Sequence, residues 1–125
     1  MPITFKVIPM GDYLLIESQG SPASFDEFRS YYLSYIKELD ESGLRRVLVD
    51  SRKVDYAGLD YHDLIAFMDD ILIKGRNLIG NRTAVLSGLS NKAHYSRLES
   101  LAVNRSFSFR WFTTMDSALE WLLRP

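Results

Sequence analysis

Two short polar segments of this 125-residue chain carry residue types suited to binding an anion. One follows the apolar run within 46–50, and the other follows the apolar run at 83–86. They offer cations, hydroxyls, an amide and a glycine, on Ser51, Arg52, Lys53, Ser87, Gly88, Ser90 and Asn91. Such groups bind anions beside a helix N-terminus, and open α/β sheets bind ligands at the carboxyl ends of parallel strands. The alternative stays open that these are ordinary polar loops.

Nucleophilic catalysis is a weaker interpretation of the second segment. Ser87 to Ser90 lies between a strand and a helix, but the G-x-S-x-G pattern of a nucleophile elbow is absent. Ser90 is interpreted as a helix N-cap. His62 falls on the polar face of its helix, which is typical of a solvated residue. His94 falls on an apolar face near a helix N-terminus, so we expect a neutral, partly buried and hydrogen-bonded ring. We find no catalytic set and predict that the protein is not an enzyme.

The sequence gives even less support for a metal site or a phosphate-binding loop than for nucleophilic catalysis. The absence of cysteine excludes thiolate ligands and a thiol nucleophile. Asp60 and Asp63 lie near His62, but acids in the first turn of a helix are explained by the helix dipole. Residues 75–80 have the G-x-x-x-x-G spacing of a phosphate loop, with Asn81 where that motif requires lysine. We therefore predict no metal and no cofactor.

Strands and helices alternate along the chain and must position these residues. Apolar alternation at 3–8 and 13–18, around turn residues at 9–12, predicts an antiparallel hairpin. Buried strands are expected at 46–50 and 83–86, and a last strand is expected where Phe107, Phe109 and Trp111 alternate with polar residues.

About four helices accompany these strands. A capping box from Ser24 to Glu27 starts the first helix, and Gly43 ends it. The second is expected to start at Asp60, the third at Ser90 and the last within 113–116. The order predicts a single α/β domain over 1–125, with a mixed sheet of about five strands: an N-terminal hairpin followed by βαβαβα.

The aromatic residues leave two interpretations open. Most of the 16 fall on core stripes. Four of them fall at stripe edges or in loops: Tyr31, Tyr56, Tyr61 and Trp121. Aromatic side chains in such places often anchor interfaces. Ordinary half-burial explains them equally well.

Net charge and hydropathy limit the classes of partner that we expect for this chain. Fifteen Lys and Arg against sixteen Asp and Glu leave a formal net charge of −1, so we expect neither nucleic acid nor an anionic membrane as the main partner. The longest apolar run, Leu64 to Met68, is far too short to span a bilayer. We see no secretory signal and expect a cytoplasmic protein.

Three segments of the chain read RRVLVDSRKV, TAVLS and FRWFTTMDSALEWLL. They resemble STAS domains, and more narrowly the SpoIIAA-like (STAS/SEC14-type) group of small bacterial proteins. In that group a strand closing on phenylalanine leads into an Asp/Glu-x-Ala-x-x-Trp-Leu helix, which matches 112–122. The resemblance implies a compact α/β sheet, often a dimer, and no common reaction. Sporulation-type antagonists also carry a phosphorylatable serine after the third strand; the corresponding segment, 54–60, has none.

Two functions follow as hypotheses. The first is a non-enzymatic regulatory or protein-interaction module that acts as a homodimer. The second is a carrier of a small anionic or amphipathic, lipid-like ligand, bound at the strand-end loops or between helices. The carrier hypothesis requires a cavity of about 300 Å³ or more.

Overall fold

The computed structural model describes residues 2–56, 62–63, 65–66, 69, 81–104 and 108–125. Its sheet holds five strands in the described residues: β1 (Thr4–Pro9), β2 (Leu14–Gly20), β3 (Arg46–Val54), β4 (Arg82–Leu86) and β5 (Ser108–Phe112). Their order in the sheet is their order in the chain. β1 and β2 are antiparallel, and every later neighbouring pair is parallel. The predicted mixed α/β sheet with an N-terminal hairpin is confirmed.

The described residues include three α-helices, where about four were expected: α1 (Phe25–Ser42), α3 (Lys92–Asn104) and α4 (Met115–Leu122). A short 3-10 helix, η2 (Leu89–Asn91), precedes α3. Most of the helix expected from Asp60 lies outside the described residues, as does Phe107. The residues of that segment that are described are helical: 62–63, 65–66 and 69. No helix in the described part of the chain has the length and apolar character needed to cross a membrane.

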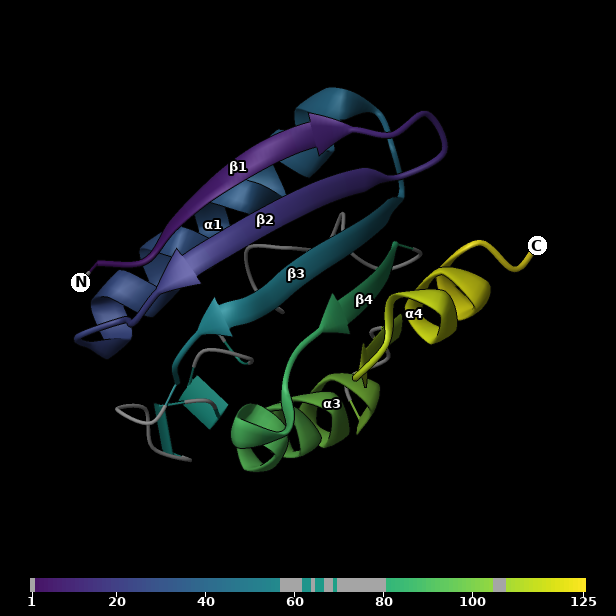
Figure 1. The fold of residues 1–125 in the computed structure, drawn as a ribbon. Coiled ribbons are helices and arrows are strands. Elements are labelled where there is room, and N and C mark those ends of the chain that lie inside the picture. The colour runs from purple at the N-terminus through teal and green to yellow at the C-terminus, as the bar shows by residue number, and fades with distance from the viewer. Residues whose placement is uncertain (1, 57–61, 64, 67–68, 70–80, 105–107) are drawn as a thin grey trace.

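The two faces of the sheet are covered unequally (Figure 1). α1 and α3 pack on one face, over a core that includes Ile16, Phe28, Tyr35, Val47, Val49, Val85, Leu98 and Phe109. On the other face α4 packs against β3, β4 and β5, through Leu48, Ala84, Leu86, Ala118 and Leu122. No described helix covers this second face over β1, β2 and the end of β3. We call this uncovered area the open face.

Local signals set the ends of α1 as the sequence predicts. Ser24 Oγ accepts from the amide of Glu27 at 3.2 Å, and Gly43 ends the helix in the left-handed region at φ 75°. The Glu27 carboxylate differs from the expected capping box. It accepts from the amides of Ala23 and Ile3, at 3.0 and 2.9 Å. These hydrogen bonds lower the pKa of Glu27 and tie the start of the chain to the start of α1.

The end of α4 is held by an arginine on β4. One guanidinium nitrogen of Arg82, Nη1, donates to the carbonyls of Trp121, Leu122 and Arg124 at 3.1, 3.2 and 2.6 Å. The guanidinium carbon lies 5.5 Å from the centre of the Trp121 ring. Carbonyls in the last turn of a helix have no partner within the helix, so Arg82 supplies the missing donor.

Replacing this arginine is therefore expected to loosen α4. Arg82→Ala should lower the free energy of unfolding by about 1.5–3 kcal/mol, since hydrogen bonds from a charged donor are lost. Arg46→Ala is the matched control, because Arg46 donates one side-chain hydrogen bond within the described part of the chain, to the Arg124 carbonyl at 3.1 Å. We expect it to cost about 0.5–1 kcal/mol. Urea unfolding of both variants is the measurement, and equal losses would contradict the role of Arg82.

Candidate functional site

The candidate site begins with an irregularity in β3. The sequence predicts a strand ending at Asp50, but β3 continues to Val54. Glu17 pairs with Asp50 and Gln19 pairs with Lys53, so residues 17–19 of β2 stand opposite residues 50–53 of β3. This shift is a β-bulge, which breaks the alternation of side chains between the two faces.

The bulge places two cations on the same side of β3. Arg52 and Lys53 are both exposed, whereas Ser51 and Val54 on either side of them are buried. In a regular strand, consecutive side chains point to opposite faces. The extra residue thus adds Lys53 to a surface that already holds Arg52 and Asp50.

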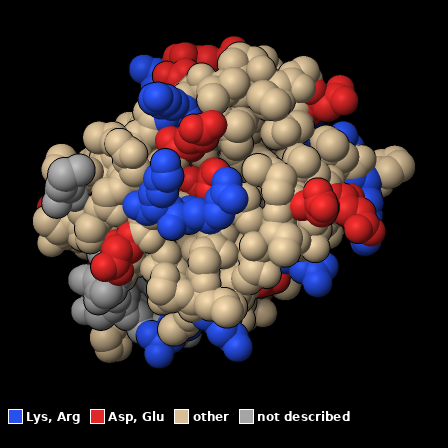
Figure 2. All heavy atoms as spheres, viewed as in Figure 1, with Lys and Arg blue, Asp and Glu red and all other residues tan. Residues whose placement is uncertain are grey.

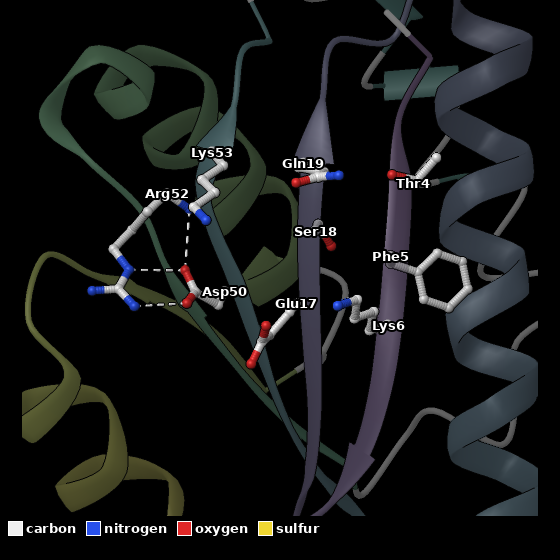
Figure 3. Close-up of a pocket in the computed structure, with 9 residues that line it drawn as sticks. All are labelled: Thr4, Phe5, Lys6, Glu17, Ser18, Gln19, Asp50, Arg52 and Lys53. Carbon is white, nitrogen blue, oxygen red and sulfur yellow. Dashed lines mark hydrogen bonds and ion pairs between the residues drawn. The ribbon is translucent and has the colours of Figure 1, made fainter.

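The open face is hollowed above β1, β2 and β3 (Figure 3). The hollow has a volume of about 520 Å³, and its polar lining residues are Thr4, Lys6, Glu17, Ser18, Gln19, Asp50, Arg52 and Lys53. Strand pairing arranges most of them in two rows across the three strands. Thr4, Gln19 and Lys53 form the first row, which we call the donor row. Lys6, Glu17 and Asp50 form the second row.

An ion pair fixes one side of the hollow. Nε and Nη2 of Arg52 donate to the two carboxylate oxygens of Asp50 at 2.9 and 2.7 Å. The Arg52 amide donates to the same carboxylate at 3.2 Å. Partial burial raises the pKa of Asp50, but the hydrogen bonds from Arg52 outweigh burial, and the net shift is downward. Arg52 is therefore held in place by a two-pronged contact.

Two other cations at the hollow are not engaged in this way. Neither Lys6 nor Lys53 forms a hydrogen bond or ion pair with a described residue. Three cations and two carboxylates line the hollow, a local charge of +1 by count on a chain of net charge −1. Figure 2 shows Lys and Arg gathered over the middle of this face, with Asp and Glu beside them.

The structure separates the predicted anion-binding residues. Arg52 and Lys53 lie on the open face, whereas Ser51, Ser87 and Asn91 are buried. Gly88 and Ser90 are exposed. A single site that uses all seven residues is thus not assembled in this structure, and ligand binding by any of them stays a prediction.

Asn91 has a structural role that explains its burial. Its Nδ2 donates to the Val54 carbonyl at 2.6 Å and to Ser87 Oγ at 3.3 Å. Its Oδ1 accepts from the Tyr56 amide at 3.3 Å. Asn91 therefore joins the end of β3 to the segment between β4 and α3.

Ser90 lies inside η2 and is not an N-cap; that expectation is wrong, because a 3-10 turn precedes α3. Gly88 takes the position before η2, and no side chain caps it there. The Ser90 hydroxyl therefore does not cap the start of α3.

The four aromatic residues predicted at an interface lie in different surroundings. Tyr31 and Tyr56 belong to the core, with 5% and 4% of their surface exposed. Trp121 is half-buried against Phe112, with ring centres 5.8 Å apart. Tyr61 lies outside the described residues. An interface role for these residues stays a prediction, and the first two contribute little surface to one.

Tyr56 belongs to a buried aromatic cluster with His94. The two rings stack at 4.1 Å with an angle of 3° between their planes. Burial lowers the pKa of His94 to about 4, as the expected neutral ring requires. The expected hydrogen bond is not found: Nε2 has no partner among the described residues. His62 is exposed, in agreement with the prediction from its helix face.

The space inside this cluster is small. The cavity lined by Phe28, Tyr31, Tyr56, His94 and neighbouring side chains has a volume of about 10 Å³, close to the size of one water molecule. Burial also raises the pKa of Tyr32 in the same cluster to about 12, so its phenol stays protonated at neutral pH. An amphipathic ligand would need a far larger cavity volume than the described side chains of α1 and α3 leave between them.

Sequence reasoning missed the β1 and β2 side of the hollow. Thr4, Lys6, Glu17 and Gln19 are exposed residues that alternate with more buried ones on two strands. Alternation indicates that they share one face, but it does not show that no helix covers that face. Lys6 opposite Glu17 was the available signal, since the hairpin places them side by side.

Comparisons with known proteins identify the fold. No family model matches the chain, and no curated protein does. Several solved structures are similar, among them the following two. One is an uncharacterized protein of the DUF3478 family with a SpoIIAA-like fold from Shewanella loihica, at TM-score 0.58 and 18% identity, covering 96% of this chain and 93% of that one. The other is an anti-sigma factor antagonist from Mycobacterium paratuberculosis, at TM-score 0.59 and 15% identity, covering 98% and 95%.

Proposed function

Because the chain has a SpoIIAA-like fold, we propose that it is a non-enzymatic regulatory domain that binds another protein across its open face. One similar structure belongs to an anti-sigma factor antagonist, a description that refers to action on another protein. The observation that carries the proposal is the open face itself. Three strands there present charged side chains that no described helix covers.

The Asp50–Arg52 pair makes this face suitable for recognition. Arginine is enriched where proteins contact one another, and a side chain that is already held loses less freedom on binding. Arg52 is held by two side-chain contacts to Asp50 while 54% of its side chain stays exposed. It therefore offers a fixed cation to a partner.

Self-association is part of the proposal. β1 is an edge strand, with β2 as its sole neighbour in the described sheet. An unpaired strand edge can accept a strand from a second copy, which would form a homodimer. Sedimentation velocity over a range of concentrations tests this part. A strict monomer at every concentration would contradict the homodimer without affecting the test of partner binding.

Charge reversal at the open face tests the proposal of partner binding. Lys53→Glu changes the net charge by two units at the hollow, and Lys92→Glu makes the same change at the exposed start of α3. We expect Lys53→Glu to reduce quantitative recovery of the partner from cytoplasmic extract by about tenfold or more, since like charges facing across an interface are costly. Lys92→Glu should recover as much as the wild type. Equal recovery with both variants, or no specific protein with the wild type, would overturn the proposal.

A further inference from the structure

The hollow on the open face combines a bulge, a row of donors and two cations that have no partner among the described residues. We propose that it binds the carboxylate or phosphate group of a small molecule, with Lys53 as the principal anchor. This ligand differs from the protein partner proposed above, and its binding does not depend on that partner.

The bulge is the first observation behind this assignment. Bulges re-aim side chains and occur often beside functional sites. Here the register shift places Lys53 next to Gln19 and on the same side of the sheet as Arg52. Without the extra residue, the alternation of β3 would direct the Lys53 side chain toward the buried face.

The donor row is the second observation. Thr4 stands opposite Gln19, and Gln19 stands opposite Lys53. Neighbouring strands are about 4.8 Å apart, so the backbone positions of this row span about 10 Å. The long side chains of Gln19 and Lys53 can bring their amide and ammonium groups to one small oxyanion within that distance. No carboxylate belongs to this row. The acidic residues stand in the second row, where Arg52 neutralises Asp50.

Glu17 limits which anions fit. Its carboxylate stands opposite Lys6 in the second row and has no hydrogen bond or ion pair to a described residue. It offsets part of the positive charge of the hollow. We therefore expect modest affinity for simple anions, and tighter binding when the Glu17 charge is removed.

The size of the hollow favours a small molecule as the occupant. Its volume of about 520 Å³ lies within the range of about 300–1,000 Å³ that ligand sites have. The cavity in the aromatic cluster is about fiftyfold smaller, and no Lys or Arg is among its lining residues. The hollow thus combines a net positive lining with enough volume for a small anionic ligand.

Titration of the full chain with citrate and with inorganic phosphate, at constant ionic strength, tests the site by amide chemical shifts. We expect saturable shifts confined to the start of β1 and the ends of β2 and β3. Lys53→Gln should weaken binding about tenfold or more, Glu17→Gln should strengthen it, and Lys92→Gln should leave it unchanged. Saturation by phosphate alone would identify a phosphate group, and saturation by citrate alone a carboxylate.

Three results would overturn this inference. They are shifts that rise linearly without saturation, equal weakening by Lys53→Gln and Lys92→Gln, and saturation by an acidic peptide but by neither small anion. A chain that loses its protein partner on Lys53→Glu but shows no saturable anion binding would contradict this inference alone. A chain that binds citrate or phosphate but has no protein partner would contradict only the function proposed above.

Discussion

Lowering the pH from 6.5 to 4 is expected to cost the protein about 3 kcal/mol of unfolding free energy through His94 alone. The pKa of this histidine is about 4 in the folded chain and 6.5 when unperturbed. Between these values the unfolded chain binds a proton that the folded chain does not. The contribution is thus fully present above pH 6.5 and is lost as the pH falls toward 4.

The physical cause is desolvation of the His94 ring, which is largely buried where it stacks on Tyr56. The imidazolium form would be desolvated there, and its Nε2 has no acceptor among the described residues. Burying an unpaired charge is costly, so the ring stays neutral.

Replacing the ring removes this pH dependence. Urea unfolding of His94→Phe at pH 4 and 6.5 should show a smaller loss than the wild type, because phenylalanine keeps the stacking and takes up no proton. His62→Phe is the matched control, since His62 is exposed; it should retain the wild-type loss.

His94→Gln is a second variant, which controls for an effect of the larger aromatic ring of phenylalanine. Carboxylates add acid sensitivity of their own to every variant, so the difference between variants is the quantity to compare. Identical losses in the wild type and both His94 variants would contradict this account.

Asn91→Ala is expected to lower the free energy of unfolding by about 2–5 kcal/mol. The substitution leaves the Val54 carbonyl and the Tyr56 amide without their Asn91 partner in the protein interior. Each buried backbone group that loses its partner costs about 1–3 kcal/mol. Both groups lie where β3 ends, so the loss should loosen the strand that carries the bulge.

Ser90→Ala is the control for this variant, because residue 90 is adjacent in sequence and exposed. An N-cap serine would cost about 1 kcal/mol on removal. Since Ser90 lies inside η2, we expect a change of at most about 0.5 kcal/mol. Chemical denaturation measures both variants. A loss below about 0.5 kcal/mol for Asn91→Ala would show that the three hydrogen bonds of Asn91 do not hold this junction.

Features that depend on neighbouring residues were predictable from the sequence. The hairpin follows from alternation and turn residues, the end of α1 follows from Gly43, and the inward face of α4 follows from the spacing of Ala118 and Leu122. In each of these cases the determining groups lie within a few residues of one another.

The site could be predicted only in part, because long-range contacts decide it. The bulge depends on how β2 and β3 pair, so neither the length of β3 nor the exposure of Lys53 is visible in 46–54 alone. Polar residues after a strand indicate a solvated loop. Asn91 instead satisfies backbone groups 35 and 37 residues away. Tyr31 lies in the core because it falls on the buried stripe of α1, together with Phe28 and Tyr35.

The central claim is that the open face is the contact surface for a protein partner. Photo-cross-linking in cells tests it most directly, with a photoreactive amino acid in place of Gln19 on the open face or of Lys37 on exposed α1. We expect one specific cross-linked protein from position 19 and none from position 37. A specific cross-link from position 37 alone, or none from either, would contradict it.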